Sequence, residues 1–255
     1  MTSGYAPING LRMYYEIHGE GKPLVLIHGG GSTIGTSFGR IIPDLAKHRQ
    51  VIALELQAHG HTNDRETPES FEHDADDVAT LVKFLKIKQA DFFGFSNGGN
   101  TTLQMAIRHP ELVRKIILGS AFYKREGMVS QFWEGMKNAS LENMPVELKD
   151  AYKRVAPDSN GLVTMFTKDK NRMLEFKDWK DQELQLIKVP VLIISSDRDV
   201  VRPEHAVQMH RLIAQSQLIV LPGLHGEYIG EITTLPGGAL QAKLVVPLIE
   251  NFLDQ

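Results

Sequence analysis

The chain has 255 residues, the size of one large α/β domain with a substantial core. Apolar residues make up 42% and charged residues 23%, a balance that excludes a disordered chain. With a net charge of -3, no strong field attracts phosphate backbones or anionic lipid, so we expect neither nucleic acid nor a membrane as a partner. The absence of cysteine excludes disulfides, thiol nucleophiles and cysteine-ligated metals.

The first residues carry neither the basic segment nor the apolar core of a signal peptide, and no apolar run approaches the roughly 18 residues of a membrane span. We therefore expect a soluble protein whose compartment is the cytoplasm. A periplasmic or secreted location stays open if a signal peptide has been removed. The sequence does not predict the oligomeric state.

Short runs rich in Val, Ile and Leu alternate with amphipathic segments, a pattern typical of βαβ units around a parallel sheet that is buried on both faces. The predicted fold class is therefore α/β, with a mostly parallel sheet of the eight-stranded type flanked by helices. The first predicted helix is expected to start with a cap and first-turn proline at Thr67 and Pro68. Strands are predicted over 12–18, 23–28, 50–56, 90–94, 113–119, 189–195 and 216–221, and helices over 70–85, 98–109 and 204–213.

Residues 121–187 interrupt this alternation, since they contain many charges and no strand-like run. We expect them to form an inserted helical cap, with 1–120 and 188–255 forming one core domain. A pair of ordinary surface helices with an apolar core face stays open as the alternative. The large apolar residues of this insertion are Phe132, Trp133, Met136, Met144, Met165, Phe166, Met173 and Trp179.

The strand predicted over 23–28 ends at His28 and is followed by three glycines, residues 29–31. Such a loop lets main-chain N–H groups approach a ligand closely. Acyl transfer turns a carbonyl oxygen into an oxyanion that needs two N–H donors, and we expect Gly30 to supply one. A P-loop is not favoured, because Thr36 occupies the position of its lysine. His28 is expected to be structural.

Two polar clusters follow the strand predicted over 50–56. His59 and His61, with Asp64 nearby, are a weak pattern for zinc, because no third histidine stands at the spacing of a metallohydrolase. The acidic residues of 73–77 lie in the first turns of a predicted helix, where they favour the helix dipole, and are expected to form a solvated face. We expect no metal and no cofactor.

A serine stands in Gly94-Phe95-Ser96-Asn97-Gly98, between a predicted strand and a predicted helix, which is the context that G-x-S-x-G requires. So sharp a turn strains the serine backbone and closes only if the residues two before and two after lack side chains. The turn exposes Ser96 and aims a helix N-terminus at developing negative charge, with the N–H of Asn97 as the second oxyanion donor. A phosphate-binding turn is disfavoured, because G-x-G-x-x-G is absent here.

Asp199 and His225 each follow the end of a predicted strand. The carboxyl ends of parallel strands meet at one edge of the sheet, so we expect both residues to lie near Ser96. A serine hydroxyl is a weak nucleophile and needs a base, and the imidazole needs a carboxylate to fix its tautomer. These residues predict Ser96 as nucleophile, His225 as general base and Asp199 as acid, with Asp197 open as the alternative acid.

On these residues, the whole chain resembles the α/β-hydrolase fold family, in particular its small capped esterases and lactonases. Segments 28–30, 94–99 and 199–203 and His225 are similar to that family's oxyanion, nucleophile, acid and base segments, and they follow in its chain order. The family's acid usually precedes such a proline by a few residues, which favours Asp199 over Asp197.

Two features depart from the family's pattern. Ser196 replaces the glycine that commonly precedes the acid, and a long segment, residues 226–238, separates His225 from the final helix. The second departure affects the expected mouth of the pocket, so the substrate class is not carried over from the family.

The resemblance implies a serine hydrolase that cleaves a small ester or related acyl bond through an acyl-enzyme. Lactonase, thioesterase, C–C hydrolase and perhydrolase chemistry stay open, as does a non-catalytic small-molecule receptor on the same fold. Ser96 disfavours dehalogenases and epoxide hydrolases that use an aspartate nucleophile. We expect an uncharged, moderately hydrophobic small-molecule substrate, contacted by Gly31, Phe95, Phe132, Trp133 and Tyr228.

Overall fold

A computed structural model describes residues 1–235 and 239–255 of the chain. Its centre is an eight-stranded sheet with the order β1-β2-β4-β3-β5-β6-β7-β8. β1 and β2 run antiparallel to their neighbours, and the other strands are parallel. The strands are Thr2–Ile8 (β1), Leu11–His18 (β2), Lys22–Ile27 (β3), Arg49–Leu54 (β4), Ala90–Phe95 (β5), Val113–Gly119 (β6), Val191–Ser196 (β7) and Ser216–Leu221 (β8).

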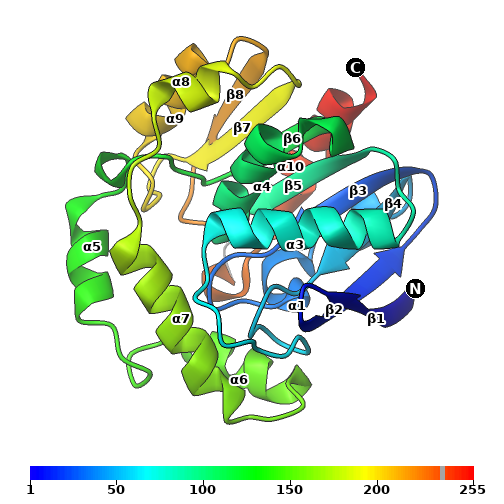
Figure 1. Cartoon of the computed structure of the whole chain (residues 1–255). Coiled ribbons are helices and arrows are strands. Elements are labelled where there is room, and N and C mark those ends of the chain that lie inside the picture. Colours follow the sequence, from blue (N-terminus) through cyan, green and yellow to red (C-terminus); the bar gives the residue numbers. More distant parts are fainter. Residues whose placement is uncertain (236–238) are drawn as a thin grey trace.

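Helices cover both faces of the sheet (Figure 1). One face packs against α3 (Phe71–Phe84), α4 (Asn97–Arg108) and α9 (Pro203–Leu212), and the other against α1 (Ile34–Phe38), α2 (Ile42–Leu45) and α10 (Ala239–Asp254). Every residue of β5 and β7 is buried, which explains why these strands are continuous apolar runs rather than alternating ones. None of the helices that the structure describes is long and apolar enough to span a bilayer.

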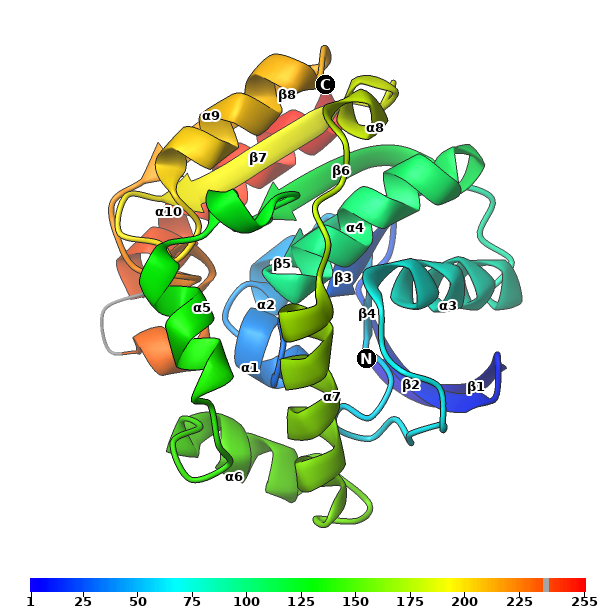
Figure 2. The same cartoon turned by 60° about the vertical axis from the view of Figure 1, so that its left-hand side comes forward.

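Between β6 and β7 the chain forms α5 (Ser130–Lys137), α6 (Val146–Val155), α7 (Gly161–Glu175) and α8 (Asp181–Gln185), and no strand. Figure 2 shows α5, α6 and α7 beyond the carboxyl ends of the central strands, where the loops after β5, β7 and β8 also emerge. Short 3-10 helices complete the described chain: Pro110–Leu112 (η1), Arg125–Gly127 (η2), Glu227–Ile229 (η3) and Ile232–Thr234 (η4).

The observed elements differ from the predicted ones at several places, among them the short helices α1 and α2, which the sequence does not predict. The sequence does not predict β1, an edge strand in which only Ala6 and Ile8 are buried. The cap of α3 is Ser70, whose side chain accepts a hydrogen bond from the His73 N–H, rather than Thr67. Within the long segment 226–238 the structure has η3 and η4, and residues 236–238 lie outside the described part.

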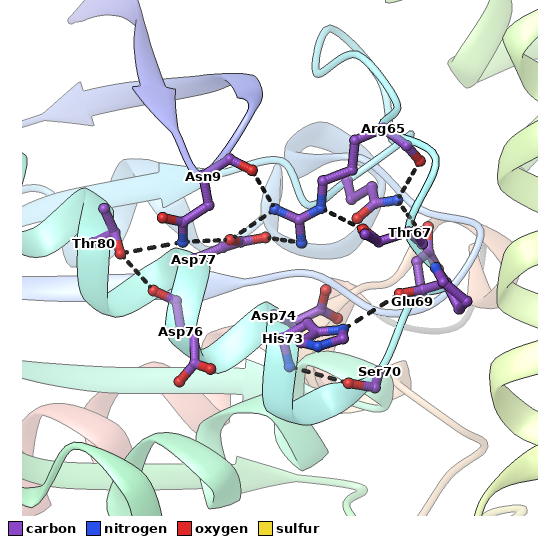
Figure 3. A network of polar contacts seen from close by, with 12 residues as sticks. Asn9, Arg65, Thr67, Glu69, Ser70, His73, Asp74, Asp76, Asp77 and Thr80 are labelled. Atoms are coloured by element: carbon purple, nitrogen blue, oxygen red, sulfur yellow. Dashed lines mark hydrogen bonds and ion pairs between the residues drawn. The ribbon is translucent and has the colours of Figure 1, made fainter.

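The expected solvated face at residues 73–77 is wrong for two of its aspartates, because Asp74 and Asp77 are buried. Asp77 accepts two hydrogen bonds from the Arg65 guanidinium, and Asp74 accepts one from Arg172 of α7 (2.7 Å). Figure 3 shows the first pair, with Asn9 of the β1–β2 turn on the same carboxylate. Cations 12 and 98 residues away along the chain neutralise these side chains, and the local helix pattern does not reveal them.

Candidate active site

Ser96 occupies the turn between β5 and α4, with φ 54° and ψ -121°. A non-glycine residue adopts this backbone only under strain, and the packing around it must hold it there. A Cβ on Gly94 would collide with the carbonyl oxygen of Gly98, and one on Gly98 would collide with that of Ile27. The two glycines therefore let the turn close against backbone on both sides, as the sequence predicts.

The structure brings Ser96, His225 and Asp199 together from three loops. Nε2 of His225 lies 3.0 Å from Oγ of Ser96, and Nδ1 lies 2.6 Å from Oδ1 of Asp199. Since the carboxylate can only accept, Nδ1–H donates to it and Nε2 is left to accept the serine proton. The alternative acid, Asp197, is exposed and instead accepts the N–H of Gly223 (2.8 Å).

The environment of this triad supports a charged imidazole. Burial by itself lowers the pKa of His225, but the charge and hydrogen bond of Asp199 outweigh it and raise the pKa above its ordinary value. Burial alone would raise the pKa of Asp199, whereas His225, the Ser120 hydroxyl and the Val201 N–H together lower it. An ion pair can thus form once the imidazole takes a proton.

Two hydroxyl groups lie behind the acid. Ser120, at the end of β6, donates to Oδ2 of Asp199 (2.5 Å) and lies 2.9 Å from the hydroxyl of Tyr228. Tyr228 belongs to the long segment after His225 and is completely buried. Its buried hydroxyl has a pKa raised well above the ordinary value, mainly by burial, and so stays protonated.

The glycine loop after β3 lies beside Ser96. Among the described residues, the backbone N–H groups of Gly30 and Asn97 have no hydrogen-bond acceptor, and both residues line the cavity that contains Ser96. The flanking N–H groups are occupied: Gly29 donates to Oγ of Ser37 (3.2 Å) and Gly31 to Oδ2 of Asp169 (2.5 Å). The two free donors are those that the sequence predicts for an oxyanion.

A cavity of about 360 Å³ opens at Ser96 and His225. Of the predicted contact residues, Gly31 and Phe132 line it, and Phe95, Trp133 and Tyr228 do not. The prediction is corrected for these three. Phe95 is buried beneath the His225 ring, Tyr228 lies behind the acid, and Trp133 packs under the Arg125 guanidinium. The apolar wall is made instead by α5, α6, α7 and the segment before α6, through Met136, Met144, Leu148, Met165, Phe166 and Met173.

Sequence reasoning missed Asp169, which α7 brings to the cavity. Arg172 and Nε2–H of His59 (3.0 Å) both donate to its carboxylate. His59 also donates Nδ1–H to the carbonyl of Gln57 (2.7 Å), so both ring nitrogens act as donors and the ring is cationic. Although burial lowers the pKa of His59, Asp169 raises it to about 9. No motif marks Asp169, since its partners outside α7 are more than 70 residues away.

The remaining histidines of these loops have protein partners. Nδ1–H of His28 donates to the Gly29 carbonyl (2.7 Å) and Nε2 accepts the Leu56 N–H (3.1 Å), in keeping with the structural role expected of it. His61 contacts Glu55 (2.9 Å) and Asp64 contacts Lys168 (2.7 Å). His59, His61 and Asp64 thus face three different partners.

Residues 22–144 match the family model for the α/β hydrolase fold. The solved structure of a serine hydrolase of carbazole degradation (CarC) superposes with a TM-score of 0.80 at 22% identity, covering 99% of this chain and 98% of that one. The chain has the α/β-hydrolase fold. The chain is 28% identical to serine hydrolase BPHL of Homo sapiens, over 94% of this chain and 87% of the relative. It is also 38% identical to 2-hydroxymuconate semialdehyde hydrolase of Pseudomonas sp. (strain CF600), over 44% of this chain and 41% of the relative.

Proposed function

We propose that the protein is a serine hydrolase that cleaves a small, uncharged ester or related acyl bond. The observation that carries the proposal is the pair of contacts made by His225, at 3.0 Å to Ser96 and 2.6 Å to Asp199. An imidazole held between a hydroxyl and a buried carboxylate is the arrangement that activates a serine at neutral pH.

In the proposed reaction Oγ of Ser96 attacks the carbonyl carbon while Nε2 of His225 takes the hydroxyl proton. The N–H groups of Gly30 and Asn97 bind the oxyanion, and His225 returns the proton to the leaving alcohol as the C–O bond breaks. Water then attacks the acyl-enzyme by the same route, releasing the acid and restoring Ser96. Asp199 stabilises the imidazolium in both steps and remains ionised.

The cavity supports a small, mostly apolar substrate. Its volume of about 360 Å³ lies near the lower end of ligand pockets, and its walls are mainly methionine, leucine and phenylalanine. Its charged lining residues already have partners: Asp169 binds Arg172 and His59, and Lys170 donates to the Ala139 carbonyl (2.7 Å). In this proposal residues 121–187 act as a cap that supplies the apolar wall. Methionine side chains adapt to differently shaped groups, so we expect several acyl chains to be accepted.

A second candidate is hydrolysis of a C–C bond next to a ketone, favoured by the likeness to 2-hydroxymuconate semialdehyde hydrolase. A further relative, 26% identical over 79% of this chain, is 2-hydroxy-6-oxo-2,4-heptadienoate hydrolase of Pseudomonas putida. In this reaction the C–C bond would break, and water would supply a hydroxyl group to the carbonyl carbon and a proton to the carbon that leaves it. For Lys170, which lines the cavity, to bind the carboxylate of such a substrate, its ammonium group must leave the Ala139 carbonyl.

Steady-state turnover of a substrate panel separates the candidates. The panel holds p-nitrophenyl acetate, butyrate and octanoate, a lactone, a thioester and 2-hydroxy-6-oxo-2,4-heptadienoate. We expect turnover of the short esters, undiminished by EDTA, and its loss in Ser96→Ala. Ser195→Ala is the matched control, since Ser195 is buried near the end of β7 and its hydroxyl hydrogen-bonds only to the Ser196 carbonyl (3.5 Å) among the described residues. Turnover of the dienoate alone would favour the second candidate, and binding without any turnover would favour a receptor.

A further inference from the structure

A carboxylate from the helical insertion lies against the glycine loop beside Ser96. Oδ2 of Asp169 accepts the Gly31 N–H at 2.5 Å, and Oδ1 accepts a hydrogen bond from the side-chain amide of Asn97 at 3.4 Å. We propose that Asp169, a residue of α7, is a positioning residue that aligns both oxyanion donors. The inference deepens the proposed serine chemistry and rests on it, because these donors matter only if an oxyanion forms.

The hydrogen bonds around Gly30 show how Asp169 acts. Gly29 is tied to Ser37 on one side, and Gly31 is tied to Asp169 on the other. The peptide groups before and after the one that carries the Gly30 N–H are therefore held in place, and this N–H keeps one direction. Gly31 has φ +64°, a conformation that glycine adopts readily but does not enforce, so an external acceptor is needed to hold it.

The same carboxylate restrains the second donor. Asn97 follows Ser96 at the first position of α4, where its backbone N–H has no acceptor among the residues that the structure describes. Its side-chain amide binds Asp169, on the side of the cavity that faces α7. Asp169 thus binds Gly31, the residue after the first donor Gly30, and Asn97, the second donor, and no other side chain binds both among the described contacts.

An anion beside a developing oxyanion would raise the barrier unless its charge were balanced. Asp169 is balanced by two buried cations, Arg172 and His59. Arg172 is in turn held by Asp74 of α3 (2.7 Å) and lies 3.6 Å from Glu69. This arrangement leaves Asp169 as a hydrogen-bond acceptor whose field at the oxyanion is largely cancelled.

The neighbouring residue Lys168 anchors the same helix without touching the site. Its ammonium group donates to Asp64 (2.7 Å) and to the carbonyls of Arg65 (2.5 Å) and Thr67 (3.1 Å). Lys168→Met therefore removes a contact between α7 and the core while leaving the glycine loop intact. It is the matched control for Asp169→Asn, because both substitutions delete one charge of α7.

The test compares both variants by p-nitrophenyl butyrate turnover and by the rate at which an alkyl fluorophosphonate labels Ser96. In the labelling step Oγ bonds to phosphorus, fluoride leaves and His225 takes the proton. We expect Asp169→Asn to lower kcat about tenfold to a hundredfold with little change in KM, and to slow labelling in parallel, because misplaced donors weaken only the transition state. Lys168→Met should change neither by more than about threefold.

Equal effects of the two variants on kcat and labelling would overturn the inference and leave the proposed function intact. A wild-type protein that neither turns over the ester nor labels would instead overturn the proposed function. If Asp169→Asn does not fold, the wild-type amide proton of Gly31 still tests the contact by NMR. A bond to a carboxylate predicts a downfield shift and slow exchange. Exchange as fast as that of an exposed loop would overturn the inference.

Discussion

The hydroxyl of Ser120 lies 2.5 Å from Oδ2 of Asp199, on the carboxylate oxygen that His225 does not use. The Val201 N–H shares Oδ1 with His225 (3.1 Å), so the acid is held from three sides. Tyr228 extends this chain of contacts through Ser120, which gives the long segment after His225 a structural role. The orientation of the acid therefore depends on residues outside the triad.

Loss of the Ser120 hydroxyl should change the pH profile of catalysis. In Ser120→Ala the charge of Asp199 is less stabilised, so the pKa of His225 should rise and the acid limb of kcat/KM should move to higher pH. We expect a loss of about tenfold at neutral pH and a smaller loss in Tyr228→Phe. A pH–rate profile checks this, and profiles identical to that of the wild type would contradict it.

The wild-type profile tests the environment of His225 itself. Because the base must be neutral and Asp199 raises the pKa of His225, kcat/KM should rise with pH through a midpoint above 6.5, the ordinary histidine value. Asp199→Asn removes the charge that raises this pKa and should lower kcat by about 10⁴-fold. A wild-type midpoint below 6.5 would be incompatible with the ion pair.

The glycines of the nucleophile turn should differ from other glycines in their tolerance of alanine. Gly98→Ala places a Cβ into the Ile27 carbonyl and should lower the free energy of unfolding by about 3 kcal/mol or more. Gly35 is the matched control, since it is exposed in α1 with open space around its Cβ position. Gly35→Ala should raise the free energy of unfolding by about 0.4–1 kcal/mol. Chemical denaturation checks both, and equal stabilities would contradict the steric argument.

The ionic cluster between α7 and the core predicts a loss of stability at alkaline pH. Burial raises the pKa of Glu69 from 4.5 to about 8, and Asp169 raises that of His59, against the effect of burial, from 6.5 to about 9. Both groups bind more protons when folded. Their contribution to stability is full below the unfolded pKa values and is lost as pH rises through about 8 and 9.

Glu69→Gln keeps the shape of the side chain and removes its titration. Both oxygens of Glu69 lack a hydrogen-bond partner among the described residues, so the amide loses no such bond. The variant should lose less stability than the wild type between pH 7 and 9, measured by urea unfolding at each pH. An equal decline in the two proteins would show that Glu69 is already ionised in the folded protein at neutral pH.

The sheet and the three triad residues could be predicted because local patterns carry them. Ser96, Asp199 and His225 each follow a buried strand, and parallel strands bring their ends to one edge. The edge strand β1 lacks such a pattern, because Gly4 and Pro7 interrupt its apolar residues. Pairing with β2 stabilises this strand. Local pattern thus predicts the buried centre of the sheet better than its edge.

The part of the site contributed by α7 could not be predicted for a different reason. Asp169 meets His59, Gly31 and Asn97 only through tertiary packing, at sequence separations of 110, 138 and 72 residues. Within its own helix Asp169 resembles any charged surface residue of the insertion. The same packing buries Asp74, which the helix dipole alone had placed at the surface.

The identity of the nucleophile is tested most directly by locating the covalent adduct of an alkyl fluorophosphonate by peptide mass spectrometry. The wild type and Ser195→Ala should each carry one phosphonyl group, on the peptide that contains Ser96. Ser96→Ala should stay unlabelled while retaining the wild-type circular dichroism spectrum. An adduct on another residue of the wild type, or ester turnover that survives in folded Ser96→Ala, would contradict the proposed chemistry.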